Sequence, residues 1–214
     1  MKKHVPALLG TSLIVAFCVI WLKRFFDITS WSVNYELITN NVFCFIYLVW
    51  QIFELRVSLR EKADKYADYG TRELYGASQS ATILLALWFA SPEKRPLALL
   101  ISSGFLLLAG IFVRAWAIRT LGQYYSHSVR TLHGHKIIDT GPYHFLRHPA
   151  YCGMLLAHAG VVAFFFSIPA LIAYVFGLVL TVVLRILVEE RMLIKLDGYA
   201  DFALSRKRLV PKIW

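Results

Sequence analysis

The chain has 214 residues, of which 58% are hydrophobic and 17% are charged, and its mean hydropathy is +0.57. A chain with so few polar side chains cannot cover the surface of a water-soluble domain of this length. The composition therefore excludes an ordinary soluble protein and indicates that the lipid bilayer is its solvent. The formal net charge of +10 fits either nucleic-acid binding or membrane topology, and the positions of the basic residues distinguish the two.

In chain order, six stretches are apolar over about 20 residues, the helix length that crosses a hydrocarbon core of roughly 30 Å. They are residues 5–22, 37–55, 74–90, 97–118, 149–166 and 169–188. The first is interpreted as an uncleaved helix, because Lys23 and Arg24 follow it directly and no small-residue cleavage site follows. The last two form a hairpin, because only Ser167 and Ile168 separate them before Pro169, which is tolerated in the first turn of a helix. We predict an all-α integral membrane protein with about six transmembrane helices and a C-terminal helical hairpin.

The Lys and Arg residues are distributed unevenly between the loops of this topology. With a cytoplasmic N-terminus, 17 of the 23 fall on the cytoplasmic side and 4 in the outer loops, while Arg114 and Arg185 fall inside predicted helices. This is the positive-inside pattern, so topology and contact with anionic membrane lipids explain the basic excess. We expect a multi-pass protein with both termini in the cytoplasm, and nucleic-acid binding is not needed to explain the charge.

Several reactive or charged residues are expected to serve packing or lipid contact. Cys18, Cys44 and Cys152 show no C-x-x-C or mixed Cys/His ligand spacing, so neither a disulfide nor a metal site is expected. His158 lies inside the fifth span and is interpreted as a packing residue. The basic residues 206–208 are expected to face lipid headgroups.

The chain reads as one membrane domain with two regions of different content. Residues 1–118 hold the first four helices and are interpreted as a transmembrane scaffold. Residues 119–214 hold a long cytoplasmic segment, the hairpin and a charged C-terminal segment. They are interpreted as the cofactor-binding part, because a long segment that connects two membrane helices more often has a function than serves only as a linker. Polar residues inside the scaffold spans either line a substrate cavity or join helices by hydrogen bonds; they are Asn40, Asn41, Gln51, Glu54 and Arg114.

The strongest local pattern is the run from Gly141 to Gly153, which reads GPYHFLRHPAYCG. Pro149 suits the first turn of the fifth helix, which places Arg147 and His148 at the cytoplasmic mouth of that helix. Unpaired backbone N–H groups and the positive helix end favour anionic ligand groups there. The alternative interpretation of these two residues is an interfacial anchor in contact with lipid headgroups.

A second pattern, Arg185 followed four residues later by Glu189, ends the sixth helix. Residues at this spacing share one helical face, and a charge within an apolar span is costly unless it is paired or faces a polar cavity. The two side chains therefore form a simple ion pair or belong to a site. Because the hairpin loop is short, His148, Tyr151, Arg185 and Glu189 are expected to lie together at the cytoplasmic face. Such a group suits a zwitterionic cofactor and an acidic, lipid-like substrate.

Taken together, these patterns resemble the isoprenylcysteine carboxyl methyltransferase family and its phospholipid-methyltransferase relatives over roughly residues 119–214. The shared features are a histidine followed by an aliphatic pair, G-x-Y, R-H-P-x-Y-x-G, an apolar hairpin and R-x-x-x-E. The resemblance implies a membrane enzyme with a cytoplasmic cofactor pocket that transfers a methyl group from S-adenosylmethionine to a membrane-borne or apolar acceptor. Carried over by position, the family's cofactor contacts fall on His135, Lys136, Ile137, Ile138, Tyr143, His148, Pro149, Ala150, Tyr151 and Glu189. The substrate-binding arginine matches Arg185, and Ser128 stands where the family offers a glutamine to the cofactor.

Methyl transfer from a sulfonium is an in-line displacement that asks the protein mainly for positioning and desolvation. Arg185 would orient an anionic acceptor, a carboxylate or a thiolate, which needs no general base. If the acceptor is an amine or a hydroxyl, His148 or a neighbouring histidine would accept its proton. The acceptor stays open at this point between a carboxylate, a phospholipid amine, a small thiol and another lipid.

Two other functions fit parts of the sequence. Membrane reductases of the sterol-reductase kind, which use NADPH, resemble the chain in the R-H-P-x-Y-x-G segment but often carry an acidic residue after its glycine, where Met154 stands. A non-catalytic scaffold or transporter gives no reason for clustered His, Arg and Glu on one membrane face. Methyl transfer is therefore preferred, with a lipid-like or small apolar acceptor and membrane lipids as partners and without metal.

Overall fold

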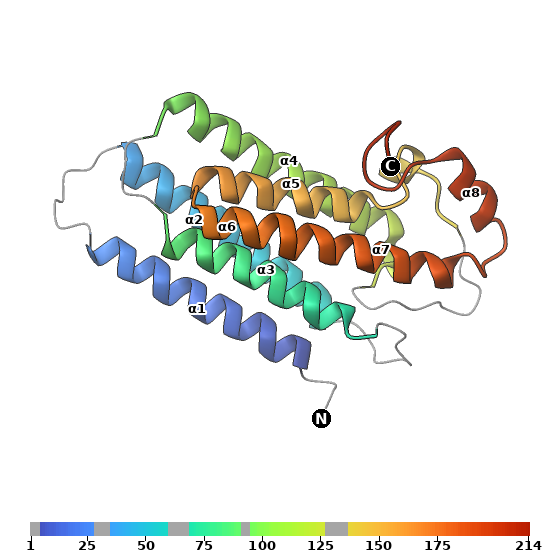
Figure 1. The fold of residues 1–214 in the computed structure, drawn as a ribbon, viewed down its shortest axis with the longest axis horizontal. Coiled ribbons are helices and arrows are strands. Elements are labelled where there is room, and N and C mark those ends of the chain that lie inside the picture. The colour runs from blue at the N-terminus through green and yellow to red at the C-terminus, as the bar shows by residue number, and fades with distance from the viewer. Residues whose placement is uncertain (1–4, 28–34, 60–68, 91–94, 127–136) are drawn as a thin grey trace.

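The computed structural model of the protein describes residues 5–27, 35–59, 69–90, 95–126 and 137–214 (Figure 1). Within these ranges the regular secondary structure is helical, apart from one isolated bridge between Leu146 and Lys207. The elements are α1 (Val5–Asp27), α2 (Tyr35–Leu59), α3 (Thr71–Trp88), α4 (Leu97–Leu121), η1 (Gly122–Tyr124), η2 (Gly141–His144), α5 (Pro149–Phe164), α6 (Ile168–Ile172), η3 (Ala173–Val179), α7 (Leu180–Leu193) and α8 (Tyr199–Ser205). The prediction of an all-α protein is confirmed for the described part of the chain.

The long helices correspond to the predicted spans. α6, η3 and α7 form one helix from Ile168 to Leu193, in which η3 is a π-helical stretch. Among the residues that the structure describes, three segments are long and apolar enough to cross a membrane: Leu37–Ser58, Leu97–Tyr124 and Ile168–Leu193. Two further apolar helical segments, Gly10–Lys23 and Pro149–Phe164, are shorter. The protein is thus an integral membrane protein with several apolar helices.

The predicted C-terminal hairpin is confirmed. α5 ends at Phe164 and α6 begins at Ile168, so only residues 165–167 make the turn. The Ser167 hydroxyl accepts a hydrogen bond of 3.4 Å from the backbone N–H of Ala170 and so satisfies one free donor of the new helix. Pro169 occupies the first turn, where its missing N–H has no intrahelical partner to lose. The reversal returns the chain to the end of the bundle from which α5 started (Figure 1).

α4 and α5 make the most extensive helix contact in the described structure. A Cβ on Gly153 of α5 would lie 2.6 Å from the Gly110 carbonyl oxygen and 2.6 Å from the Arg114 backbone nitrogen, both on α4. A Cβ on Gly160 would lie 2.6 Å from the Ser103 carbonyl oxygen. Helices in lipid associate through close packing of small residues, because leaving lipid gives an apolar side chain no hydrophobic gain. Gly153, inside the strongest sequence pattern, therefore fixes the position of α5 on α4.

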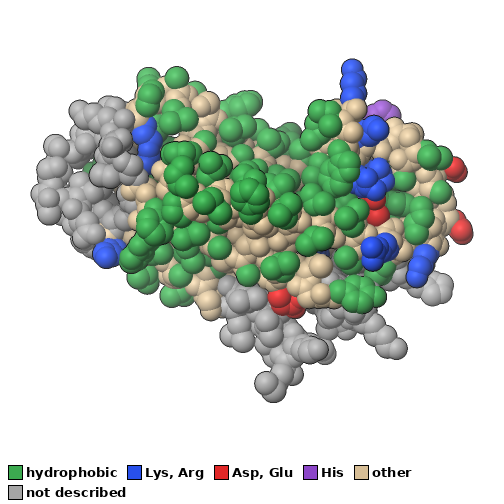
Figure 2. Space-filling view, viewed as in Figure 1, with side chains coloured by type: hydrophobic (Ala, Val, Ile, Leu, Met, Phe, Trp, Pro, Cys, Tyr) green, Lys and Arg blue, Asp and Glu red, His purple; other side chains and the backbone are tan. Residues whose placement is uncertain are grey.

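Apolar side chains cover the sides of the bundle, and Lys and Arg side chains gather at the end where α8 lies (Figure 2). Ile101, Phe105, Phe112 and Phe176 are between 64% and 70% exposed. Large apolar side chains exposed in such numbers would be costly in water and are suited to lipid contact.

One end of the bundle collects the segments that carry the sequence patterns. The start of α3, the end of α4, the start of α5 and the end of α7 lie there, and α8 with the C-terminal residues folds over it (Figure 1). The backbone N–H groups of Arg147 and His148 donate to the carbonyl oxygens of Lys207 (2.8 Å) and Arg208 (3.0 Å). The Arg208 side chain donates to Glu190 (Nε to Oε2, 2.8 Å). The Arg208 side chain thus binds a carboxylate of α7 and is 27% exposed, and the expectation that residues 206–208 face lipid headgroups stays a prediction.

Candidate active site

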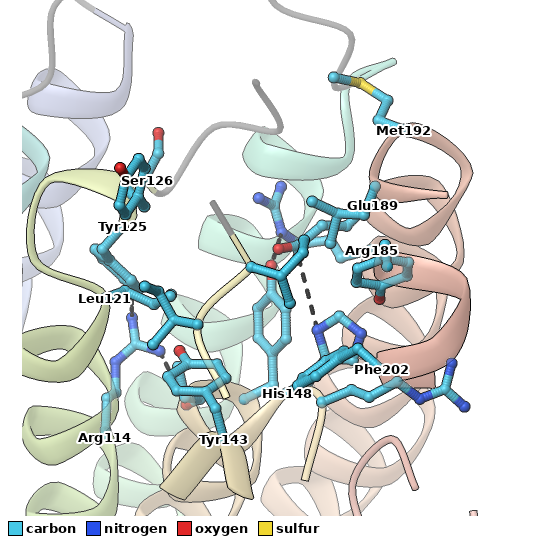
Figure 3. Close-up of a pocket in the computed structure, with 18 of the residues that line it drawn as sticks. Arg114, Leu121, Tyr125, Ser126, Tyr143, His148, Arg185, Glu189, Met192 and Phe202 are labelled. Atoms are coloured by element: carbon cyan, nitrogen blue, oxygen red, sulfur yellow. Dashed lines mark hydrogen bonds and ion pairs between the residues drawn. The ribbon is translucent and has the colours of Figure 1, made fainter. Parts of the chain in front are cut away.

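A pocket opens at this end of the bundle (Figure 3). It holds about 1000 Å³ of space unfilled by atoms, its open mouth included. Its walls come from the start of α3, the end of α4 and the residues after it, from η2, and from α5, α7 and α8. The pocket is therefore built from segments that lie far apart in the sequence.

His148 lies between the carboxylates of Glu190 and Glu189, which differ in their contacts and in their exposure. Its Nε2 lies 3.2 Å from Oε1 of Glu190 and its Nδ1 lies 4.0 Å from Oε2 of Glu189. Glu190 also accepts hydrogen bonds from Arg147 (Nη1, 2.7 Å) and Arg208 (Nε, 2.8 Å). The Glu189 side chain is 31% exposed and lines the pocket beside His148 (Figure 3). Glu190 thus fixes the loop before α5, while Glu189 faces the pocket.

Arg185 is 2% exposed although it lies in the apolar helix that ends with α7. Its Nε donates to the Tyr151 hydroxyl (3.1 Å) and its Nη1 to the Thr71 hydroxyl (3.3 Å). Its guanidinium carbon lies 5.6 Å from the centre of the Tyr75 ring. Arg185 also lines the pocket, as expected of a charge that belongs to a site. It supplies a positive charge whose orientation is fixed by α3 and α5.

A second buried arginine lines the same pocket. Arg114 of α4 donates from Nη2 to Oε2 of Glu54 on α2 (2.7 Å) and from Nε to the other oxygen of that carboxylate. It also donates to the Ala150 carbonyl oxygen (3.1 Å) and to the Tyr125 hydroxyl (3.1 Å). A buried charge is tolerated when it is paired and hydrogen-bonded in this way. The sequence offered two interpretations of Arg114: that it joins helices by hydrogen bonds, or that it lines a cavity. In the structure Arg114 does both.

Aromatic rings form much of the pocket wall; they are Tyr75, Tyr124, Tyr125, Tyr143, Tyr151, Tyr199 and Phe202. Burial raises the pKa of the Tyr143 phenol, and the nearby Glu189 carboxylate raises it further. Burial likewise raises the pKa of Tyr199. Both phenols therefore keep their protons at neutral pH. Ring faces attract cations and stack on flat heterocycles, so the wall suits a ligand that carries both.

Most site residues expected from the sequence meet at this pocket. Its walls include Ile137, Ile138, Tyr143, His148, Ala150, Tyr151, Arg185 and Glu189. Pro149 begins α5 and is buried, but it does not line the pocket. His135, Lys136 and Ser128 lie outside the described residues. The roles given to all these residues remain predictions.

Several residues at the site carried no such assignment from the sequence, and Tyr75, Arg114 and Glu190 are among them. Tyr75 comes from α3, in the region interpreted as a scaffold, and it lines the pocket. Arg114 was singled out as an intramembrane charge but was placed in the same scaffold. Glu190 gave one usable signal, a second carboxylate directly after Glu189 at the start of a segment rich in Lys and Arg. Residues 119–214 thus do not build the pocket alone.

The residues expected to be structural have ordinary partners. The Nδ1 of His158 lies 3.0 Å from the Met154 carbonyl oxygen and its Nε2 lies 3.3 Å from the Tyr47 hydroxyl. Asn41 donates to the Leu37 carbonyl oxygen (2.8 Å) and accepts from the Trp21 indole (2.9 Å). Cys18, Cys44 and Cys152 form no disulfide bond in the described part of the chain. Within the described ranges, no group of His, Cys, Asp and Glu is arranged to hold a metal ion.

Comparison with known proteins identifies similar sequences over one segment. Residues 102–195 match the model of the isoprenylcysteine carboxyl methyltransferase (ICMT) family. Protein-S-isoprenylcysteine O-methyltransferase of Saccharomyces cerevisiae is 33% identical over 92 residues, 42% of this chain, and the match spans 38% of the length of that protein. A solved structure of the eukaryotic intramembrane Ras methyltransferase ICMT aligns with a TM-score of 0.49 and 18% identity, covering 99% of this chain and 97% of that one.

The resemblance read from the sequence is confirmed over residues 102–195. That segment runs from α4 to the end of α7 and contains every described residue that lines the pocket except Tyr75, Tyr199 and Phe202. The similarity to methyltransferases and the pocket therefore fall on the same residues.

Proposed function

We propose that the protein is an S-adenosylmethionine-dependent methyltransferase that forms a methyl ester on the carboxylate of a membrane-borne acceptor of the isoprenylcysteine kind. The observation that carries this proposal is the overlap just described, in which the segment similar to methyltransferases supplies nearly all of the pocket wall. The names of the family and of the yeast relative supply the acceptor class. Because the match to that relative spans 38% of its length, activity and acceptor stand here as proposals.

The charges and the aromatic rings of the pocket wall suit S-adenosylmethionine. The Glu189 carboxylate and the faces of the tyrosine rings favour a sulfonium cation. Ile137, Ile138 and Phe202 offer apolar surface for an adenine ring. When bound there, the cofactor supplies an electrophilic methyl group, whose transfer to a carboxylate oxygen releases a neutral thioether.

The residues of this chain then have separate tasks. Arg185 holds the acceptor carboxylate, because its guanidinium is fixed by Tyr151 and Thr71 and presents a planar set of donors. A carboxylate is already a nucleophile at neutral pH, so no proton has to be removed. His148, held by Glu190, positions the start of α5 and the neighbouring wall. The aromatic wall keeps water from the reacting groups, which strengthens the electrostatic contacts.

We also propose that the pocket opens on the cytoplasmic side and that the chain crosses the membrane six times. The start of α1 and the end of α7 lie at the same end of the bundle (Figure 1), and residues at the end of α7 line the pocket. The positive-inside pattern assigns that end to the cytoplasm. An acceptor anchored in the inner leaflet would then reach Arg185 from the lipid, while the cofactor would enter from water.

Binding of S-adenosylmethionine to the purified protein in lipid nanodiscs, measured by calorimetry, tests the proposal. We expect binding that weakens at least about tenfold, or 1.4 kcal/mol, in Glu189→Gln and in His148→Ala. Asp201→Asn is the matched control, since this carboxylate is exposed on α8 and does not line the pocket. Unchanged affinity in both site variants would remove the site assignment. Binding of NADPH in place of S-adenosylmethionine would favour a reductase.

A further inference from the structure

Two buried polar groups on residues that line the pocket lack a hydrogen-bond partner among the described residues. They are the Nε of Arg147 and the hydroxyl of Tyr199. Tyr199 is only 4% exposed, so its hydroxyl is shielded from solvent. A buried donor without an acceptor destabilises a fold, and a group of this kind calls for an explanation. A ligand that accepts hydrogen bonds in this part of the pocket supplies one.

The two groups lie in the same corner of the pocket. Arg147 precedes His148 at the start of α5, and Tyr199 is the first residue of α8. Burial raises the pKa of the Tyr199 phenol, and the carboxylates of Glu190 and Glu189 raise it further. The Arg147 guanidinium lowers the same pKa, so the hydroxyl lies near all three charges. Even if Arg147 donated to the Tyr199 oxygen, the hydroxyl hydrogen would still need an acceptor.

The charges of this corner indicate that the accepting group is an anion. Glu190 accepts hydrogen bonds from Nη1 of Arg147 (2.7 Å) and from Nε of Arg208 (2.8 Å). One carboxylate thus serves two guanidinium groups, which leaves positive charge to attract a further anion. A carboxylate offers two accepting oxygens, one for the Nε of Arg147 and one for the Tyr199 hydroxyl.

The position of the corner distinguishes the carboxylate of the cofactor from that of the acceptor. Arg185, which we assign to the acceptor, lies inside the apolar helix Ile168–Leu193, whereas Arg147 lies in the segment between η2 and α5. Glu189 lies on the other side of His148, with its Oε2 4.0 Å from Nδ1, and suits an ammonium group. An α-amino acid carries an ammonium and a carboxylate on one carbon. The methionine part of S-adenosylmethionine therefore matches this corner.

We propose that the Nε of Arg147 and the hydroxyl of Tyr199 bind the α-carboxylate of S-adenosylmethionine, so that the pocket selects a methyl donor with an intact amino acid end. Glu189 accepts from the ammonium of the same end. Tyr199 lies outside residues 102–195, the segment that matches the methyltransferase family, so α8 adds a contact that the similarity does not assign. This inference rests on the proposed function and assigns two residues to one group of the cofactor.

Decarboxylated S-adenosylmethionine, in which a hydrogen replaces the carboxylate, tests this contact alone. It keeps the sulfonium, the ammonium and the adenosine. Both ligands are titrated by calorimetry into the protein in lipid nanodiscs, without acceptor, so that no acceptor carboxylate competes. We expect the wild type to bind S-adenosylmethionine at least about tenfold more tightly, because a site that hydrogen-bonds a ligand group discriminates against an analogue lacking it.

Two variants change the proposed contact. Tyr199→Phe removes only the hydroxyl and should reduce the ratio of the two Kd values by about threefold or more. Arg147→Lys keeps a positive charge beside Glu190 but has no Nε donor, and it should reduce the ratio by a similar factor. In both variants the Kd of the decarboxylated ligand should stay within about twofold of wild type, whereas a purely structural role would weaken both ligands alike.

Two control variants leave the proposed contact in place. Tyr47→Phe removes a buried hydroxyl that lies 3.3 Å from His158 and does not line the pocket. Arg185→Lys changes the arginine that we assign to the acceptor. Both should keep the wild-type ratio of the two Kd values.

Equal Kd values for the two ligands in the wild type would overturn the inference. A ratio that Tyr199→Phe or Arg147→Lys leaves unchanged would also overturn it, and so would equal weakening of both ligands or loss of the ratio in Arg185→Lys. If neither ligand binds the wild type, the proposed function itself fails. The titration of the wild type thus separates the two failures.

Discussion

The Nε of Arg185 donates a hydrogen bond of 3.1 Å to the hydroxyl of Tyr151, 34 residues earlier in the chain. This contact joins the end of α7 to the start of α5, the two ends that the C-terminal hairpin brings back to one side of the bundle. It also decides how the only charge in the apolar run Leu184–Val188 is oriented. The guanidinium is held toward the pocket, where an anionic acceptor can reach it.

Arg185→Lys keeps the charge but loses the planar fork of donors. We expect the KM of a carboxylate acceptor to rise by about tenfold or more, because a lysine cannot hold a carboxylate and the Tyr151 hydroxyl in one plane. The Kd of S-adenosylmethionine should stay within about twofold of wild type, since Glu189 and the aromatic wall remain. Arg191→Lys, an exposed change on the same helix, is the control. A rise in the cofactor Kd without a rise in the acceptor KM would contradict this role.

Glu190 and Glu189 should separate into a structural and a ligand-binding carboxylate. Glu190→Gln weakens contacts to Arg147, His148 and Arg208 at once. We expect it to lower the free energy of unfolding by about 2 kcal/mol, as charge-assisted hydrogen bonds contribute more than neutral ones. Glu189→Gln should leave the melting temperature near that of wild type and weaken cofactor binding. Thermal unfolding in the same nanodiscs measures both, and a larger loss of stability in the Glu189 variant would reverse the assignment.

The buried pair of Glu54 and Arg114 should show strong coupling. Glu54→Gln leaves the Arg114 guanidinium buried without its counter-charge, which costs about 3–5 kcal/mol in comparable buried pairs. The double variant Glu54→Gln, Arg114→Gln should be less destabilised than the sum of the single variants by at least about 1 kcal/mol. The measurement is a double-mutant cycle, which compares the unfolding free energies of the wild type, the two single variants and the double variant. Additive losses would show that the pair contributes nothing beyond packing.

The contact between α4 and α5 should not accept a larger residue at Gly153. A Cβ there would lie 2.6 Å from backbone atoms of α4, so Gly153→Val must push α5 away from Arg114. We expect a loss of about 1–3 kcal/mol in stability and weaker cofactor binding, because the start of α5 forms the pocket wall. Gly104→Val, where a Cβ meets no atom within 4 Å, should leave both unchanged. Similar behaviour of the two variants would contradict the packing described here.

Local features of the sequence were enough to predict the long apolar helices, but not the short helix α8. The length and hydropathy of each span are properties of neighbouring residues, and so is the turn signal of Ser167 and Pro169, which the structure confirms at the start of α6. The gathering of His148, Tyr151, Arg185 and Glu189 followed from the shortness of the hairpin loop, and all four line one pocket.

The residues missed by the sequence depend on contacts between distant segments. Tyr75 reaches the pocket because α3 packs along α6, η3 and α7, an arrangement that no local pattern specifies. Glu190 binds the Arg208 side chain, which lies beside it only because the C-terminal segment folds back over Arg147 and His148. Periodicity shows which face of a helix is apolar, but the choice of partner helix is decided by close packing such as that at Gly153.

The central claim is that the pocket transfers a methyl group from S-adenosylmethionine to a carboxylate. The most direct test incubates the purified protein in nanodiscs with methyl-labelled S-adenosylmethionine and N-acetyl-S-farnesyl-L-cysteine, then treats the extracted product with alkali. We predict that wild type, but not the Arg185→Ala variant, transfers label that alkali releases as volatile methanol, because a methyl ester is hydrolysed by base. Label that resists alkali, or equal labelling by both proteins, would contradict the account.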